Sequence, residues 1–309
     1  MSGIRNKIYN IKGVRAMKCG IVILNYNDYD MTSNLLNIIH RFDSLDKIVV
    51  VDNHSTDDSY KKILEYESDK VVVIRALENG GYSKGNNLGI RYLINNTDVD
   101  IIGIANSDVE FNDDFVEKIK KRFEKRNNYS IISGLQVDAN GNVGSHPFWP
   151  EYTILQYFQM KFFSSRLVDH LLKPKAYHNY VMQKLESKKD FFRVGAVEGS
   201  LFFIRKSDLQ TIGLLDENVF MYCEEDILAK KIDKIGQKIG VDSSICYLHY
   251  GSVTTQKTLS SKVKINHIFN SSVYYFNNYQ SNKKILQILN WGLCYLLRLE
   301  GTILLNIKG

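Results

Sequence analysis

The residues best suited to chemistry stand at the ends of short apolar runs in the first third of the chain. The clearest case is the stretch DIIGIANSDVEF, where a β-branched run leads into Asn106, Ser107 and Asp108. Such a run, bounded by polar residues, is typical of a central strand, and open α/β sheets bind ligands outside the carboxyl ends of their strands. Asp108 is therefore expected at a ligand-binding edge of a sheet.

Three earlier apolar runs end in the same way. For any one cluster, turn and helix-cap preferences of Asn, Asp, Ser and Gly explain the polarity equally well. Four clusters in succession are more than loop polarity predicts, and they indicate a site assembled from several strands. The earlier clusters are Asn25 and Tyr26, then Asp52, Asn53 and Ser55, then Asn79 and Gly81, with Lys84 and Asn86 opening the following segment.

The elements that must position these residues alternate through the first half of the chain. Apolar patterns predict strands beginning near residues 18, 47, 70 and 99, with helices at 30–42, 59–67 and 83–95 between them. Strands and helices that alternate at these lengths predict an α/β fold with a mainly parallel sheet, right-handed crossovers and flanking helices. This is a nucleotide-binding type of scaffold.

The second half is less regular. The patterns predict a helix at 111–126, a strand at 129–138 and a strand within 194–209. A helix at 220–236 and a late strand that ends at His249 follow. Residues 146–190 are aromatic and basic without a clear period, so they are expected to form an irregular insertion.

Composition narrows the class of protein. The chain has 309 residues, 44% of them hydrophobic and 24% charged, which is enough for a large core and excludes disorder as a whole-chain description. The net charge of +6 is spread out, so nucleic acid is not an expected partner. Four cysteines without C-x-x-C spacing, and a start without an export signal, predict a reducing, cytoplasmic location.

The ordered pieces VILNYN, VVVDNHSTDDS, ENGGYSKGNNLGI, IIGIANSDVEF, GLLDENVFMYCEEDILAKKIDKIG and LHYGSVT resemble the family 2 glycosyltransferases of the GT-A (Rossmann-like) fold. The resemblance is closest to the rhamnosyltransferase-like branch that builds bacterial surface polysaccharides, and it spans residues 18–255. It implies a leader at 1–17, a nucleotide-binding half at 18–110, an acceptor half at 111–255 and a C-terminal helical extension at 256–309.

On the donor side, the resemblance implies that Asp108 and His249 hold Mg²⁺ or Mn²⁺ against the diphosphate of a sugar nucleotide. The motif Asn106-Ser107-Asp108 departs from the family because its first acid is an amide. Asp52 matches the acid that accepts the N–H of the base, which favours a uridine or thymidine nucleotide. Lys84 is expected either to neutralise phosphate charge or to be a solvated lysine at a helix start.

On the acceptor side, the resemblance assigns Glu198, Gly199 and Glu224, with a general base at the start of the helix at 220–236. Alignment without gaps places Glu225 at the base position, whereas matching by residue type selects Asp226. Adjacent helical residues point about 100° apart, so only one of the two can face the acceptor hydroxyl. The gap-free register favours Glu225.

The resemblance thus implies an inverting, metal-dependent glycosyltransferase. Its donor would be a UDP- or dTDP-sugar, with dTDP-rhamnose among the candidates, and its acceptor a glycan or lipid-linked glycan at the inner face of the cell membrane. Two alternatives stay open: an inactive nucleotide-sugar-binding subunit, and a nucleotidyltransferase, although VILNYND lacks the Gly-rich basic signature of the latter. The apolar stretch after residue 285 is expected to lie on a membrane, to form a homodimer or to pack on the domain.

Overall fold

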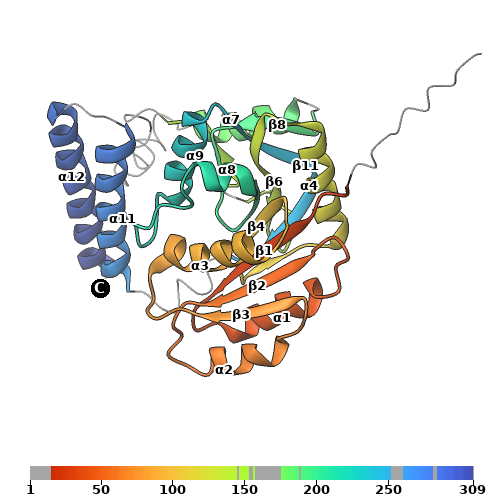
Figure 1. Ribbon diagram of the computed structural model, residues 1–309. Coiled ribbons are helices and arrows are strands. Elements are labelled where there is room, and N and C mark those ends of the chain that lie inside the picture. Colours follow the sequence, from red (N-terminus) through yellow and green to blue (C-terminus); the bar gives the residue numbers. More distant parts are fainter. Residues whose placement is uncertain are drawn as a thin grey trace, which may run out of the picture.

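The computed structural model describes residues 15–144, 146–152, 156, 175–187, 189–251, 260–280 and 284–308. Most of the expected leader, much of the insertion at 146–190 and the end of the LHYGSVT motif lie outside the described residues. The alternation predicted for the nucleotide-binding half is confirmed within them (Figure 1). In chain order, the strands there are β1 (Cys19–Asn25), β2 (Lys47–Asp52), β3 (Val71–Arg75), β4 (Ile101–Asn106) and β5 (Val109–Glu110).

One mixed sheet forms the centre of the described part. Its strand order is β3-β2-β1-β4-β10-β6-β11-β5, with β8 paired to β11. The first four strands are mutually parallel, as predicted, whereas β10 runs antiparallel to both of its neighbours. The second-half strands are β6 (Tyr129–Val137), β8 (Phe191–Val194), β10 (Leu201–Arg205) and β11 (Lys238–His249).

Helices cover both faces of this sheet, because alternate side chains along each strand point to opposite faces and both faces are apolar. In β1, Ile21 and Ile23 pack on one face with α1 (Tyr29–Ile39) and α4 (Asp113–Lys125). Val22 points to the other face, toward α3 (Gly81–Asn96) and α9 (Glu224–Lys234). Three shorter elements complete the layers: α2 (Ser59–Ile63), a 3₁₀ turn (Leu64–Tyr66) and α8 (Lys206–Thr211).

The insertion is more regular than its sequence predicts. Its described residues include β7 (Phe148–Trp149), which pairs with β9 (Ala196–Val197), and the helix α7 (Lys175–Glu186). The expectation of an irregular segment is wrong for these residues. Phe148 is fully buried and meets Tyr180 and Phe192 edge-on, so tertiary packing and pairing with β9 organise a stretch that lacks a helical or strand period of its own.

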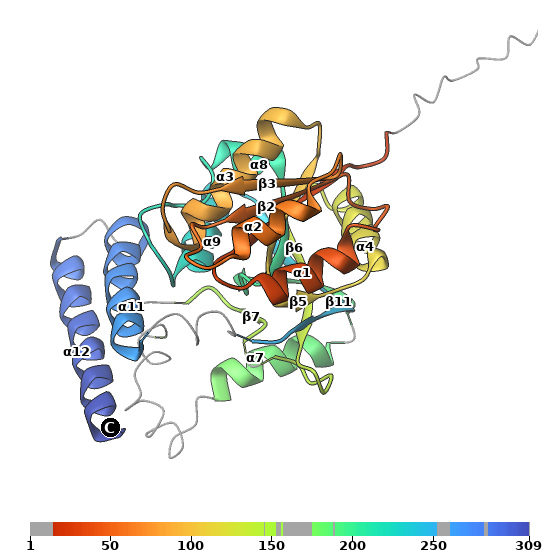
Figure 2. The same ribbon diagram turned by 90° about the horizontal axis from the view of Figure 1, so that it is seen from below.

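The C-terminal extension is a helical hairpin at one flank of the domain. It consists of α11 (Ser261–Tyr275), a π-helical turn (Phe276–Gln280) and α12 (Lys284–Lys308), and Figures 1 and 2 show α12 on the outside. The hairpin packs through Phe276 and Cys294 against Ile227 of α9. Among the described residues, no helix is both long and apolar enough to cross a bilayer.

Candidate active site

The carboxyl ends of β1, β2 and β4 lie next to one another because these strands are paired in parallel. Asn25 at the end of β1 is in register with Asp52 of β2, and Leu24 is in register with Asn106 of β4. The polar clusters that follow these strands are thus brought to one edge of the sheet. This edge is where a doubly wound sheet binds its ligand.

A buried hydrogen-bond cluster ties the ends of β1 and β2 together. Asn25 donates from Nδ2 to Asp52 Oδ1 over 2.9 Å and to Ser55 Oγ over 3.1 Å. The backbone N–H of Ser55 donates to Asp52 Oδ2 over 3.0 Å, and Arg75 Nε lies 3.8 Å from the same oxygen. Asp52 is fully buried, and each of its oxygens accepts one of these bonds, so each has capacity for another donor.

A second cluster shapes the loop between β3 and α3. Asn53 donates from Nδ2 to Asn79 Oδ1 over 2.9 Å and to the carbonyl of Gly81 over 3.1 Å. Gly81 adopts a φ of 81°, and a Cβ there would lie 2.1 Å from the carbonyl oxygen of Phe220. Only glycine fits this close approach. The N–H of Tyr82 donates to the same carbonyl over 3.0 Å, which fixes this loop against the segment before α9.

Three residues predicted to bind the donor take no part in the hydrogen bonds of this cluster. Lys84 is half exposed and pairs with Glu78 at 2.5 Å. Asn86 is fully buried in α3 and donates to the carbonyl of Tyr82 over 3.0 Å. Tyr26 is partly exposed at the end of β1.

On the other side of the edge, Asp108, His249 and Glu198 form what we call the carboxylate–histidine chain. Pairing of β5 with β11 sets Val109 opposite His249 and so brings Asp108 to the imidazole. His249 Nε2 lies 3.4 Å from Asp108 Oδ1, and Nδ1 lies 3.4 Å from Glu198 Oε1. All three side chains are largely buried.

Two carboxylates on opposite ring nitrogens favour the imidazolium form. Burial lowers the pKa of His249, but hydrogen bonds and charges from Asp108 and Glu198 raise it more, to about 10. Gln136 Nε2 lies 2.8 Å from Nδ1, while its Oε1 is buried without a partner among the described residues. The opposite amide orientation would place Oε1 as an acceptor for Nδ1–H.

The donor atoms of this chain fit a divalent cation shared with phosphate. A divalent cation that replaced the proton on Nε2 could be bound by His249 Nε2 and Asp108 Oδ1 together, and Glu198 and Gln136 hold the far side of the imidazole as outer partners of metal ligands do. In the described part of the chain, no group of three or more His, Cys, Asp or Glu residues could hold a metal ion. Two protein ligands that leave positions for phosphate oxygens and water are typical of Mg²⁺ sites.

A third group of contacts joins this chain to α9. Glu198 Oε2 accepts from Ser200 Oγ over 3.0 Å. The backbone N–H of Gly199 donates to Glu225 Oε1 over 3.2 Å, and its carbonyl accepts from the Tyr82 hydroxyl over 2.6 Å. A Cβ at Gly199 would lie 2.8 Å from Glu225 Oε1, so the missing side chain makes room for this carboxylate.

The three acids at the start of α9 lie in different surroundings. Glu225 lies against Gly199, whereas Asp226 accepts from Trp149 Nε1 over 2.9 Å and lines a separate pocket. Burial, followed by the charge of Glu225, raises the pKa of Glu224 to about 8. Before the helix, Tyr222 and Cys223 both have positive φ, at 73° and 68°. Backbone strain of this kind concentrates at functional sites, where it sets side-chain direction.

Comparison with known proteins identifies the family. Residues 20–213 match the family model described as Glycosyl transferase family 2. The chain belongs to this family. It is also 29% identical over 206 residues to the low-salt glycan biosynthesis hexosyltransferase Agl10 of Haloferax volcanii, covering 66% of this chain and 58% of that protein. The chain therefore spans somewhat more than half the length of this curated relative.

Solved structures share the fold of this family 2 chain. Staphylococcus aureus TarS 1-349 in complex with UDP-GlcNAc has a TM-score of 0.54 at 15% identity and covers 89% of this chain and 70% of its own. The mannosyltransferase PcManGT of Pyrobaculum calidifontis, in complex with GDP-Man and Mn²⁺, has a TM-score of 0.55 at 13% identity and covers 94% and 76%. These likenesses confirm the GT-A-type fold.

Several residues of this candidate site are absent from the sequence prediction. Arg75 is the last residue of β3, where a cation after an apolar run could have been noticed. Tyr82 and Tyr247 gave no such signal, because their hydroxyls meet Gly199 and Ser200 only after the chain has folded. Asp28 accepts from Ser107 Oγ over 3.2 Å across 79 residues of sequence.

Proposed function

We propose that this protein is an inverting, metal-dependent glycosyltransferase that moves a sugar from a UDP- or dTDP-sugar to a glycan acceptor. Family membership supports this function over a nucleotidyltransferase. The observation that carries the proposal is the position of Glu225, whose carboxylate reaches Gly199, while the adjacent Glu198 reaches His249, which in turn reaches Asp108. The segment Glu198–Gly199 thus separates the proposed base, Glu225, from the proposed diphosphate site at Asp108 and His249.

On the donor side, Asp52 and Asn25 would recognise the base, with Arg75 and the loop held by Asn53 close to the nucleotide. The remaining acceptor capacity of Asp52 supports recognition of the imide N–H of uracil or thymine. Adenine presents no such imide at this edge. A panel of nucleotide sugars with either base, dTDP-rhamnose included, identifies the donor.

In the transfer step, Glu225 accepts the proton of an acceptor hydroxyl. The hydroxyl oxygen forms the new glycosidic bond to the anomeric carbon, and the bond from that carbon to the diphosphate oxygen breaks with its electron pair. Attack opposite the leaving group inverts the anomeric configuration, and Glu225 later releases its proton to water. Mg²⁺ or Mn²⁺ held by Asp108 and His249 would neutralise the charge of the departing diphosphate.

Donor hydrolysis by water tests this function without knowledge of the acceptor. Wild-type protein is expected to release nucleoside diphosphate from a UDP- or dTDP-sugar with Mn²⁺ and to stop when EDTA is added. Asp108→Asn should abolish the reaction because it removes the only anionic ligand proposed for the metal, whereas Asn106→Ala should cost less. Undiminished hydrolysis by Asp108→Asn at saturating Mn²⁺ would exclude the ligand role. Donor binding without hydrolysis in the wild type would favour the inactive-subunit alternative.

The face of α12 that points away from α11 supports a lipid-linked acceptor at a membrane. Most of its exposed side chains between residues 285 and 303 are apolar, and they include the stacked pair Trp291 and Tyr295, with ring centroids 5.4 Å apart. An apolar stripe with aromatic residues is typical of helices that lie in a bilayer interface. The stripe also contains Ile285, Ile288, Leu289, Leu296, Leu299 and Ile303.

Flotation with anionic phospholipid vesicles tests this surface. Ile288→Glu with Leu296→Glu should release the protein from vesicles while donor hydrolysis persists, because charges in the interface oppose insertion. Leu77→Glu alters an apolar residue that is 96% exposed elsewhere and serves as the control. If the double variant instead turns a dimer into a monomer and vesicles bind neither form, the stripe is a subunit interface.

A further inference from the structure

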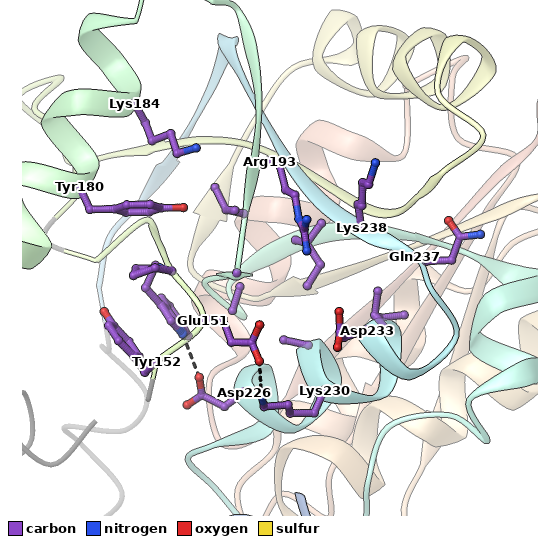
Figure 3. Close-up of a pocket in the computed structure, with 18 of the residues that line it drawn as sticks. Glu151, Tyr152, Tyr180, Lys184, Arg193, Asp226, Lys230, Asp233, Gln237 and Lys238 are labelled. Carbon is purple, nitrogen blue, oxygen red and sulfur yellow. Dashed lines mark hydrogen bonds and ion pairs between the residues drawn. The ribbon is translucent and has the colours of Figure 1, made fainter. Parts of the chain in front are cut away.

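A pocket lies on the Asp226 side of α9, separate from the contacts of Glu225. Its volume is ≈ 260 Å³, and its walls come from α7, α9, β8, the start of β11 and the segment from Trp149 to Tyr152. Figure 3 shows these side chains converging on one space. Asp226 is next to Glu225 in the chain, and Ala196 in its wall lies two residues before Glu198. The pocket therefore adjoins the proposed active site across one layer of backbone.

Cations exceed acids around this pocket by one: Lys184, Arg193, Lys230 and Lys238 line it, against Glu151, Asp226 and Asp233. Glu151 is paired with Lys230, and Asp226 accepts from Trp149. The remaining cations are Lys184, Arg193 and Lys238, and none of them has an acidic partner among the described residues. In the view of Figure 3 these three lie on the upper side of the pocket, and the acids lie below. The Lys238 ammonium lies over the ring of Tyr129, 6.0 Å from its centroid, and Tyr129 does not line the pocket. The upper side thus offers the positive charges of Lys184 and Arg193 to an occupant of the pocket.

The surroundings of Lys184 contain aromatic rings and other cations, so its charge is not neutralised. Its ammonium lies over the rings of Tyr180 and Phe192, at 5.4 and 5.9 Å from their centroids. Burial lowers the pKa of Lys184, and the charges of Lys189 and Arg193 lower it further. An anion between Lys184 and Arg193 would relieve this repulsion. Arg193 adds a planar fork that matches carboxylate and phosphate oxygens.

Aromatic rings form another part of the lining, which favours a saccharide over a small inorganic anion. Trp149, Tyr152, Tyr180 and Tyr275 all border the space. Aromatic faces pack against the C–H groups of sugar rings, while indole and phenol edges keep hydrogen-bonding capacity. A small inorganic anion would use the cations and leave these rings without a contact.

We propose that this pocket binds an anionic saccharide, one that carries a phosphate or a carboxylate, as the part of the acceptor beyond its reacting hydroxyl. This assignment rests on the proposed glycosyltransferase function. The cations Lys184 and Arg193 hold the anionic group, and Trp149 and Tyr180 contact the sugar rings. A site of this kind would select acceptors by charge without contacting the donor.

Direct binding of defined probes tests the pocket in the full-length protein. Titration calorimetry compares trehalose 6-phosphate and glucuronic acid with neutral trehalose and with inorganic phosphate. At least one anionic sugar is expected to bind tenfold or more tightly than both neutral trehalose and phosphate. Saturating UDP with Mn²⁺ should not displace it. Three results would overturn the proposal. Equal affinity for phosphate would mean that the pocket is only an anion site, and displacement by UDP would mean that the probe binds in the donor site. Failure of both anionic sugars to bind would exclude the pocket as a saccharide site.

Matched variants locate the binding. Lys184→Gln with Arg193→Gln should weaken the anionic probe at least tenfold, because each removes a charged hydrogen-bond donor. Lys121→Gln with Lys125→Gln removes the same charge from exposed positions on α4 and should change nothing. Equal losses in both pairs would indicate general attraction and sink the site. Donor hydrolysis is measured on the same samples: hydrolysis without probe binding rejects the pocket alone, and probe binding without hydrolysis rejects the proposed function alone.

Discussion

Replacing Glu225 by Gln separates its proposed role as a base from its role in the structure. Glutamine keeps an oxygen where Oε1 now accepts from the N–H of Gly199 at 3.2 Å, so the contact survives the change. What is lost is the ability to take up a proton. Asp226→Asn is the matched control, because its amide oxygen can still accept from Trp149 Nε1 at 2.9 Å.

The expected loss follows from the size of general-base catalysis. A positioned base contributes about 10²- to 10⁴-fold, so Glu225→Gln should lower turnover by that factor, which corresponds to about 3–5 kcal/mol in the barrier. Asp226→Asn should leave turnover within a few-fold of wild type, because its carboxylate points to the other pocket. Donor affinity should be unchanged in both variants, since neither residue contacts the proposed nucleotide cluster.

Release of nucleoside diphosphate, with water or a glycan as acceptor, is measured beside donor affinity by calorimetry. A large loss in Asp226→Asn with normal turnover in Glu225→Gln would show that the gap-free register is wrong by one residue. Normal turnover in both variants would mean that these acids only cap α9. A loss of donor affinity that parallels the loss of turnover would assign Glu225 to binding instead of proton transfer.

Two further outcomes concern stability. Gly81→Ala should lower the free energy of unfolding by about 2–4 kcal/mol, since its Cβ would clash with Phe220, whereas Gly141→Ala, at similar φ but with open space, should cost about 1 kcal/mol in urea titrations. Folding raises the pKa of Glu224 to about 8, so the folded state holds a proton that the unfolded state releases near pH 4.5. Stability should fall as pH rises from about 5 to 9, and Glu224→Gln should flatten this loss, by about 1.4 kcal/mol for each pKa unit. An unchanged pH profile in that variant would contradict the burial argument.

The sequence predicted best those elements whose pattern is local. The apolar run before Asp108 and the three runs before it became β4 and β1 to β3, because a buried parallel strand needs continuous apolar residues on both faces. The antiparallel direction of β10 carried no such signal. Its run Leu201–Arg205 is compatible with either direction, and only pairing with β4 and β6 decides between them.

Side-chain direction was harder to predict than position in the chain. Asn25 and Asp52 could be placed at one edge from strand order alone, since parallel neighbours end together. Lys84 could not, because its pairing with Glu78 depends on the turn at Gly80 and Gly81. The order Asp108, His249, Glu198 depends on the pairing of Val109 in β5 with His249 in β11 across 140 residues, which no local pattern specifies.

The start of α9 shows how one local device can serve two sites. Tyr222 and Cys223 turn the chain through two consecutive left-handed residues, so the helix begins with Glu225 against Gly199 and Asp226 against Trp149. Because neighbouring helical side chains diverge by about 100°, one turn of backbone delivers a carboxylate to each side of the wall. The same helix start therefore supplies both the proposed base, Glu225, and an acid that lines the proposed acceptor pocket, Asp226. A shift of this helix by one residue would bring Asp226 to the position of Glu225 against Gly199, which is why the paired amide variants at these positions test the whole arrangement.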